Sequence, residues 1–101
     1  MIYRVLLCTL LATPAAAFEV TIQNGGGQDL TGISVFEVQG NTVIDDNLGS
    51  YGNPIKPGAS ASFDLAITRC MSVIFYYGFD NGAEAEATAD LCQGTSFLLN
   101  E

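Results

Sequence analysis

The stretch FYYGFDNGAEAEA, residues 75–87, places bulky aromatic residues before an Asp-Asn-Gly turn signal and an alternation of Glu with Ala after it. A cysteine lies close to this stretch on either side, Cys70 before it and Cys92 after it. If residues 80–82 form a hairpin loop with Gly82 in the left-handed conformation, the numbers of facing residues sum to 162, as 70 and 92 do. A two-residue loop would instead direct the two cysteines to opposite faces of the sheet. The sequence therefore predicts a hairpin closed by a Cys70–Cys92 disulfide.

The hydrophobic pattern supports the same register, because residues that face each other across two strands share one face of the sheet. One face is wholly apolar and sets large side chains against small ones: Met71, Val73, Phe75, Tyr77 and Phe79 against Leu91, Ala89, Ala87, Ala85 and Ala83. The other face is mostly polar: Cys70, Ser72, Ile74, Tyr76 and Gly78 against Cys92, Asp90, Thr88, Glu86 and Glu84. We expect Phe75 and Ala87 to be buried neighbours and Tyr76 and Glu86 to lie outside.

Alternating apolar and polar residues predict further strands along the chain. They are expected at residues 18–23, 30–38, 41–44, 60–67 and 96–99. The apolar positions change parity at Phe36, which predicts a bulge or a twist near this residue, and residues 45–58 are expected to be mostly loop. No segment after residue 17 repeats apolar residues at helical spacing. We predict a single all-β domain over residues 18–101, a small antiparallel β-sandwich of six or seven strands.

The first seventeen residues are typical of a secretory signal peptide, with Arg4, an apolar run over residues 5–11, Pro14, and Ala at positions 15 and 17. The apolar run is shorter than the ~20 residues that cross a bilayer, so no helical membrane anchor is expected. Cleavage would leave 84 of the 101 residues and two of the three cysteines. We predict a periplasmic or secreted protein, in a compartment where a disulfide can form.

The mature chain is expected to be strongly acidic. Arg4 leaves with the signal peptide, so two bases, Lys56 and Arg69, stand against eleven acids, a net charge of −9. This charge argues against nucleic acid and against an anionic membrane surface as partners. A basic protein or a metal cation is the compatible kind of partner.

The residues needed for common catalytic systems are missing. The chain contains no His, which excludes Ser-His-Asp and Cys-His systems and His-based metal sites. The glycines at 25–27 lack the spacing of a phosphate-binding loop and are expected to connect two strands. We therefore predict that the protein is not an enzyme and has no catalytic residues, no cofactor and no dedicated metal site.

Two carboxylate-based alternatives stay open. Calcium could bind at Asp45 and Asp46 or at the turn that contains Asp80, since this ion prefers carboxylate and amide oxygens. A small carboxylate-dependent hydrolase could instead use a pair of acids from Asp45, Asp46, Glu84 and Glu86.

The candidate interaction residues are Tyr51, Tyr76, Glu84 and Glu86. Tyrosine is enriched at protein-binding surfaces, and Tyr76 is expected beside Glu86 on the polar face of the hairpin. We expect an exported binding or interaction module of unknown partner. An alternative is an acidic periplasmic inhibitor of a basic enzyme such as a lysozyme, because charge complementarity speeds encounter.

A series of short motifs resembles a group of small exported bacterial proteins of unknown function with a two-cysteine β domain. The motifs are Asn24-Gly25, Leu48-Gly49, IKPG at 55–58, Cys70 with Phe75, the turn at 80–82, and Asp90-Leu91-Cys92. The chain departs from that group in having no Trp before Leu48 and Ser72 in place of an Asp. Some members carry an argininosuccinate lyase label, which would imply a long helical enzyme with catalytic His and Ser loops. This chain does not support that label.

Overall fold

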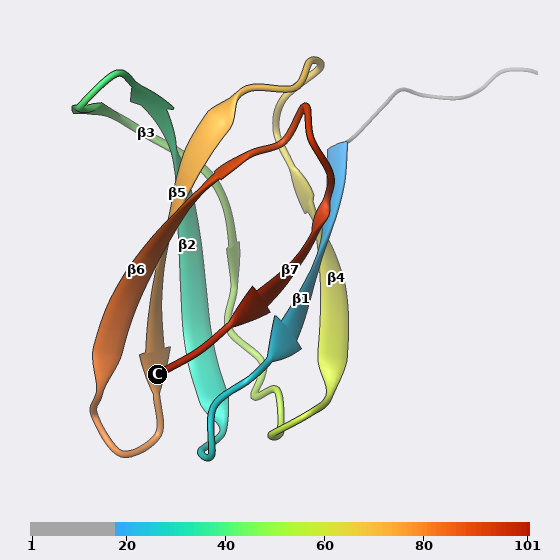
Figure 1. The fold of residues 1–101 in the computed structure, drawn as a ribbon, viewed down its shortest axis with the longest axis vertical. Coiled ribbons are helices and arrows are strands. Elements are labelled where there is room, and N and C mark those ends of the chain that lie inside the picture. Colours follow the sequence, from blue (N-terminus) through green and yellow to red (C-terminus); the bar gives the residue numbers. More distant parts are fainter. Residues whose placement is uncertain (1–17) are drawn as a thin grey trace, which may run out of the picture.

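The computed structural model describes residues 18–101, which form a β-sandwich of two layers (Figure 1). The predicted signal peptide, residues 1–17, lies outside the described residues. The strands are β1 (Phe18–Asn24), β2 (Leu30–Gln39), β3 (Thr42–Tyr51), β4 (Ser60–Leu65), β5 (Ser72–Phe79), β6 (Glu84–Asp90) and β7 (Ser96–Leu99). The seven strands and the all-β class confirm the fold predicted from sequence.

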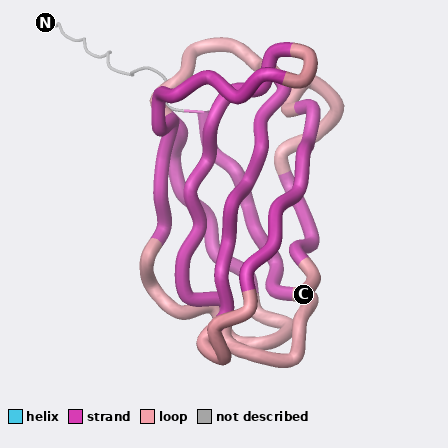
Figure 2. The backbone as a smooth tube through the Cα atoms, turned by 90° about the vertical axis from the view of Figure 1, so that its left-hand side faces the viewer, coloured by secondary structure: helices cyan, strands magenta, loops and turns pink. Residues whose placement is uncertain are grey.

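The strands form one sheet of three, in the order β4-β1-β7, and one of four, in the order β3-β2-β5-β6. They run along the long direction of the sandwich, and the loops gather at its two ends (Figure 2). Neighbouring strands are antiparallel except β1 and β7, which pair in parallel. Strands β1 and β7 are far apart in sequence, and the chain crosses from β6 in one sheet to β7 in the other. Parallel pairing needs such a crossover connection, because a hairpin joins only antiparallel strands.

The β5–β6 hairpin has the predicted register. Phe75 pairs with Ala87 and Tyr76 with Glu86, so facing residues sum to 162 along the whole ladder. Gly82 has φ +88° in the turn, and the Asn81 side chain accepts a hydrogen bond from the Ala83 N–H at 3.0 Å. The Asp-Asn-Gly sequence is therefore turn chemistry.

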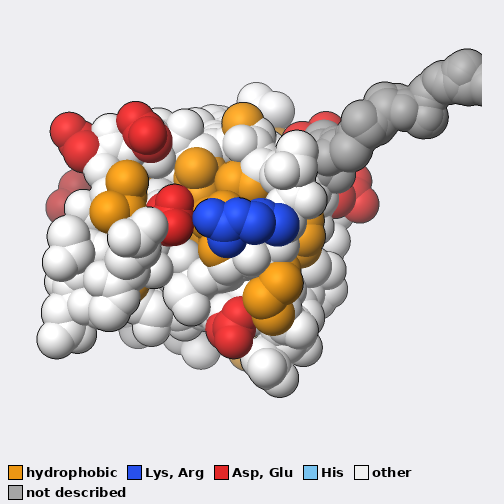
Figure 3. All heavy atoms as spheres, turned by 90° about the horizontal axis from the view of Figure 1, so that it is seen from above, with side chains coloured by type: hydrophobic (Ala, Val, Ile, Leu, Met, Phe, Trp, Pro, Cys, Tyr) orange, Lys and Arg blue, Asp and Glu red, His pale blue; other side chains and the backbone are white. Residues whose placement is uncertain are grey.

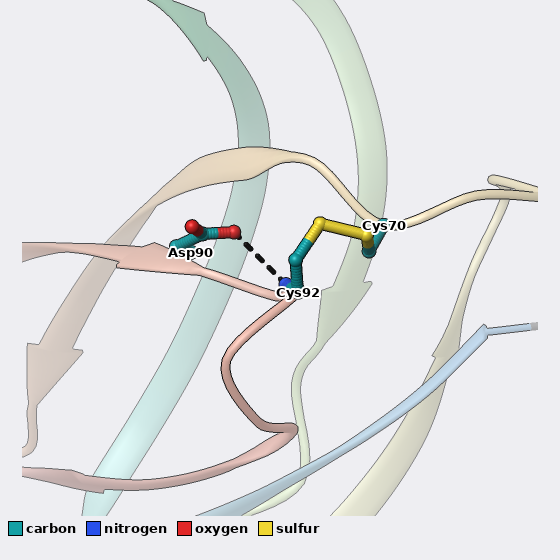
Figure 4. The surroundings of a disulfide bond; sticks show 3 residues. All are labelled: Cys70, Asp90 and Cys92. Atoms are coloured by element: carbon teal, nitrogen blue, oxygen red, sulfur yellow. Dashed lines mark hydrogen bonds between the residues drawn. A yellow bond between two sulfur atoms is a disulfide. The ribbon is translucent and has the colours of Figure 1, made fainter.

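The predicted disulfide joins the open end of this hairpin (Figure 4). The Cα atoms of Cys70 and Cys92 are 5.0 Å apart, within the range that a disulfide spans. The Cys92 N–H donates a hydrogen bond to Asp90 Oδ1 at 2.9 Å, which fixes the chain as it leaves β6. The disulfide therefore holds β5 and β6 together at one end of the hairpin, and the turn at Gly82 joins them at the other.

Strand β3 is longer than predicted. It continues from residue 44 to Tyr51, where the sequence analysis expected a loop, so that expectation was wrong. Its polar stretch pairs with β2, and the register of this pair shifts around Phe36, as predicted, although the extra residues lie on β3 and not on β2. A Cβ atom at Gly49 would lie 2.9 Å from the carbonyl oxygen of Asp64, so the glycine permits a close approach of β3 to β4. Tertiary pairing here outweighs the low strand propensity of Asp and Asn.

The core lies between the two sheets. Val20 and Ile22 of β1 and Phe75 of β5 are fully buried, and the Phe75 and Phe97 ring centroids are 5.3 Å apart. The predicted inner face of the hairpin is confirmed, since its aromatic residues at 75, 77 and 79 are buried. Apolar burial of this kind is the main stabilising contribution in a domain of this size.

Asn24 is the one fully buried polar side chain in residues 18–101, and it fastens the end of the sandwich where β1 leaves. Its Nδ2 donates to the carbonyl oxygens of Gln28 at 2.7 Å and Ile55 at 2.8 Å. Its Oδ1 accepts the Gly26 N–H at 2.8 Å. The glycines after it connect β1 to β2, as predicted. Every polar atom of this amide therefore has a partner, as burial requires.

The C-terminus is held at the same end. The Tyr77 hydroxyl donates a hydrogen bond to the Asn100 carbonyl oxygen at 2.7 Å. Burial raises the pKa of Tyr77, because loss of hydration disfavours the phenolate. The neutral phenol is therefore the form that the folded protein stabilises.

Candidate functional site

The candidate site lies on the solvent side of the sheet β3-β2-β5-β6. Side chains alternate between the two sides of a sheet, so those next to the buried core residues in sequence point outward. We call this side the acidic face. Its apolar centre consists of Phe36, Val43, Ile74 and Tyr76. Its flanking carboxylates are Asp45 on β3 and Glu84, Glu86 and Asp90 on β6.

The apolar centre exposes large side chains to water. Phe36 and Tyr76 meet edge to face, with ring centroids 5.7 Å apart and planes at 71°. Tyr76 is 38% exposed and Val43 is 40% exposed, two of the three large apolar residues of the described chain that are this open. Ile74, which faces Phe36 across β2 and β5, is only 5% exposed although it points away from the core. A packed aromatic pair at the surface is typical of an interaction site.

A shallow hollow of about 510 Å³ lies beside Tyr76, lined by Tyr76, Tyr77, Gly78, Glu84, Ala85 and Glu86. Gly78, which has no side chain, lies in its floor, and Gly78 faces another glycine, Gly32, on β2. The register sets Glu86 next to Tyr76 and Glu84 next to Gly78. A bare glycine floor between an aromatic wall and two carboxylates can receive a long cationic side chain. Its charge would lie near the tyrosine ring and the carboxylates.

The acidic face carries no base. None of its four strands contains Lys or Arg, and the two bases of residues 18–101, Lys56 and Arg69, lie in loops. The Lys56 Nζ atom lies 3.7 Å from Oδ2 of Asp29, a residue that is not on this face. Figure 3 shows one end of the sandwich, where the Lys and Arg atoms in view occupy one small area and Asp and Glu side chains lie around it. The negative potential of the acidic face is therefore not offset by neighbouring cations within the described residues.

The predicted interaction residues fall into two places. Tyr76, Glu84 and Glu86 come together at the hollow, as the hairpin register predicts. Tyr51 does not join them, since its ring stacks on Phe63 of the other sheet with centroids 5.5 Å apart and planes at 25°. Tyr51 thus packs at the edge of the core.

Sequence reasoning missed Phe36, Val43, and the pairing of Gly78 with Gly32 beside the hollow. The parity change at Phe36 was the one available signal, because β2 keeps a regular register with β5 there, so an apolar residue next to the buried Val35 points outward. The pairing of Gly32 with Gly78 depends on the register of β2 against β5, which no turn chemistry specifies.

The four carboxylates considered for hydrolysis do not converge. Asp45 and Asp46 are consecutive residues of one strand and point to opposite sides, whereas Glu84 and Glu86 lie on the opposite edge of the sheet. All four are exposed. This arrangement does not favour the hydrolase alternative.

The calcium alternative finds no suitable ligand set. Residues 18–101 contain no group of three or more His, Cys, Asp or Glu side chains placed to hold a metal ion. At the turn with Asp80, the Asn81 side-chain oxygen already accepts the Ala83 N–H. Calcium takes six or more oxygen ligands as a rule, several of them carboxylates, so this arrangement does not favour a calcium site.

Comparison of the chain with protein-family models, curated proteins and solved structures found no match. The resemblance to small exported two-cysteine proteins therefore stays a prediction. No helix in the described part of the chain has the length and apolar character needed to cross a membrane.

Proposed function

We propose that this protein is an exported, non-enzymatic binding module that holds a basic protein partner on the acidic face. The observation that carries the proposal is the exposed Tyr76, packed on Phe36 and flanked by Glu84 and Glu86 on a sheet without bases. Charged groups at such a surface steer association, and the aromatic centre supplies the contact area.

Export is supported by two independent features. The first is the signal-peptide pattern of residues 1–17, which in other proteins directs export from the cytoplasm. The Cys70–Cys92 disulfide fits a small domain in an oxidising compartment, where such bonds persist. A basic partner would therefore be a periplasmic or extracellular protein.

Inhibition of a basic enzyme such as a lysozyme is a second candidate, and the hollow beside Tyr76 favours it. Its open volume of about 510 Å³ is sufficient for one arginine or lysine side chain of the enzyme. An activity assay separates this candidate from plain binding, because an inhibitor lowers lysozyme turnover in proportion to the amount bound.

The test is retention of proteins from a periplasmic extract on the immobilised protein, at low and at moderate salt. Tyr76→Ser removes the aromatic centre, and Leu98→Ser is the matched control, since Leu98 is 56% exposed on the other sheet. We expect a basic protein to be retained by the wild type and by Leu98→Ser but not by Tyr76→Ser. Retention of acidic proteins only, or equal retention by both variants, would refute the proposal.

A further inference from the structure

We infer that the free edge of β6 accepts an extended basic segment of the partner as an added antiparallel strand. This inference rests on the proposed function, because it takes the partner to be basic. It adds the conformation of the partner and the atoms that hold it. Addition of a strand to a sheet edge is a general mode of peptide recognition, in which main-chain hydrogen bonds supply affinity and alternate side chains supply specificity.

The main chain of β6 is oriented for such pairing. The Leu91 N–H donates to the Met71 carbonyl oxygen at 3.0 Å, and the Phe79 N–H donates to the Ala83 carbonyl oxygen at 2.8 Å. These bonds mark the odd-numbered residues of β6 as the hydrogen-bonded positions of the ladder with β5. The even-numbered residues alternate with them and direct N–H and C=O away from β5. Glu84, Glu86 and Thr88 therefore present both main-chain groups at an edge that no described strand covers.

The other edges of the two sheets are irregular, short or covered, whereas the main chain of β6 is regular and open. Strand β3 contains register shifts, and β7 has only 4 residues. Strand β4 runs beside β3, where the Ala66 N–H donates to the Leu48 carbonyl oxygen at 2.8 Å. Strand β6 has 7 residues in unbroken register, without proline or lysine. A long regular edge is a template for pairing with another chain, which makes β6 the edge best suited to an added strand.

The side chains of β6 select the occupant. Glu84, Glu86 and Asp90 share one side of the strand, so pairing of β6 with a second copy of itself would bring like charges together. A strand with Lys or Arg at the facing positions would instead form opposite-charge pairs. On the inner side Ala85, Ala87 and Ala89 are half-buried, because the three-stranded sheet ends at β7. Apolar side chains at the alternate positions of the incoming strand would cover them.

The probe is a peptide as long as β6 in which lysine and valine alternate. In an antiparallel added strand, each lysine would face an even-numbered residue of β6 and point its own N–H toward that residue. Methylation of the lysine main-chain nitrogens should therefore weaken binding at least about tenfold, because several hydrogen bonds are lost together. Methylation of the valine nitrogens leaves those bonds intact and is the matched control. Isothermal titration of both peptides against the mature protein measures the difference.

A pair of protein variants tests the same contact from the other side. Thr88→Pro removes a main-chain donor at the free edge without breaking the ladder to β5, whereas Thr88→Val keeps that donor. We expect weaker peptide binding only for Thr88→Pro. If Thr88→Pro does not fold, as circular dichroism would show, the two methylated peptides decide the question.

The outcomes separate this inference from the proposed function. Equal affinity of the two methylated peptides, or dimerisation of the protein through β6 in the absence of peptide, would overturn the edge-pairing inference. In the Tyr76→Ser variant the two readouts are independent. If this variant still binds the two methylated peptides with different affinity, the β6 edge is intact. If it also retains the basic partner as well as the wild type does, the role of the aromatic centre is refuted. If Tyr76→Ser loses the partner and the two methylated peptides bind with equal affinity, the aromatic centre is supported and the edge-pairing inference is refuted.

Discussion

Replacing both Cys70 and Cys92 by serine should destabilise the protein strongly. The bond joins residues 22 positions apart and encloses the whole β5–β6 hairpin. Loss of a loop closure of that length raises the entropy of the unfolded chain and lowers the free energy of unfolding by roughly 3 kcal/mol. In a domain of this size each kcal/mol corresponds to about 4–8 °C in melting temperature, so the expected fall is about 12–24 °C.

Thermal unfolding followed by circular dichroism measures this effect. The oxidised wild type, the reduced wild type and the double serine variant are compared at one pH. Reduced protein and double variant should melt together, because both lack the same constraint and the inner face of the hairpin is unchanged. A fall below about 4 °C, equivalent to less than about 1 kcal/mol, would contradict the reasoning. It would show that the bond does not restrict the unfolded chain.

Two further predictions concern the same hairpin. Gly82→Val should lower the free energy of unfolding by about 1–3 kcal/mol, and by more than Gly82→Asn, because φ is +88° at this position. No atom lies within 4 Å of a new Cβ there, so the difference reports backbone strain and not a steric clash. Equal losses in urea unfolding would contradict this. The pKa of Tyr77 is raised on folding, so its stabilising contribution is complete below about pH 10 and is lost as pH rises through the folded-state pKa. Tyr77→Phe should flatten the loss of stability in that alkaline range, and an equally steep loss in both proteins would contradict it.

The hairpin could be predicted from sequence because two local signals agree on it. The loop at Gly82 and the alternation of apolar residues specify one register, and the cysteine spacing specifies the same one. Tyr76, Glu84 and Glu86 followed directly, since facing residues share a face.

The rest of the sheet pairing was not accessible in this way. The parallel pairing of β1 with β7 joins the two ends of the domain, and β3 forms despite Asp45, Asp46 and Asn47. Both depend on contacts between residues distant in sequence, which local propensity does not record. For the same reason Phe36 and Val43 were missed.

The most direct test of the acidic face is a nuclear magnetic resonance titration. Isotope-labelled mature protein is titrated with lysozyme as a basic probe at low salt, and the amide shifts are mapped on both sheets. We expect the largest changes at Phe36, Tyr76 and Glu86, smaller ones with added salt, and none at Leu98 on the opposite sheet. Changes centred on the β4-β1-β7 sheet, or no change at any residue, would contradict binding of a basic protein at the acidic face.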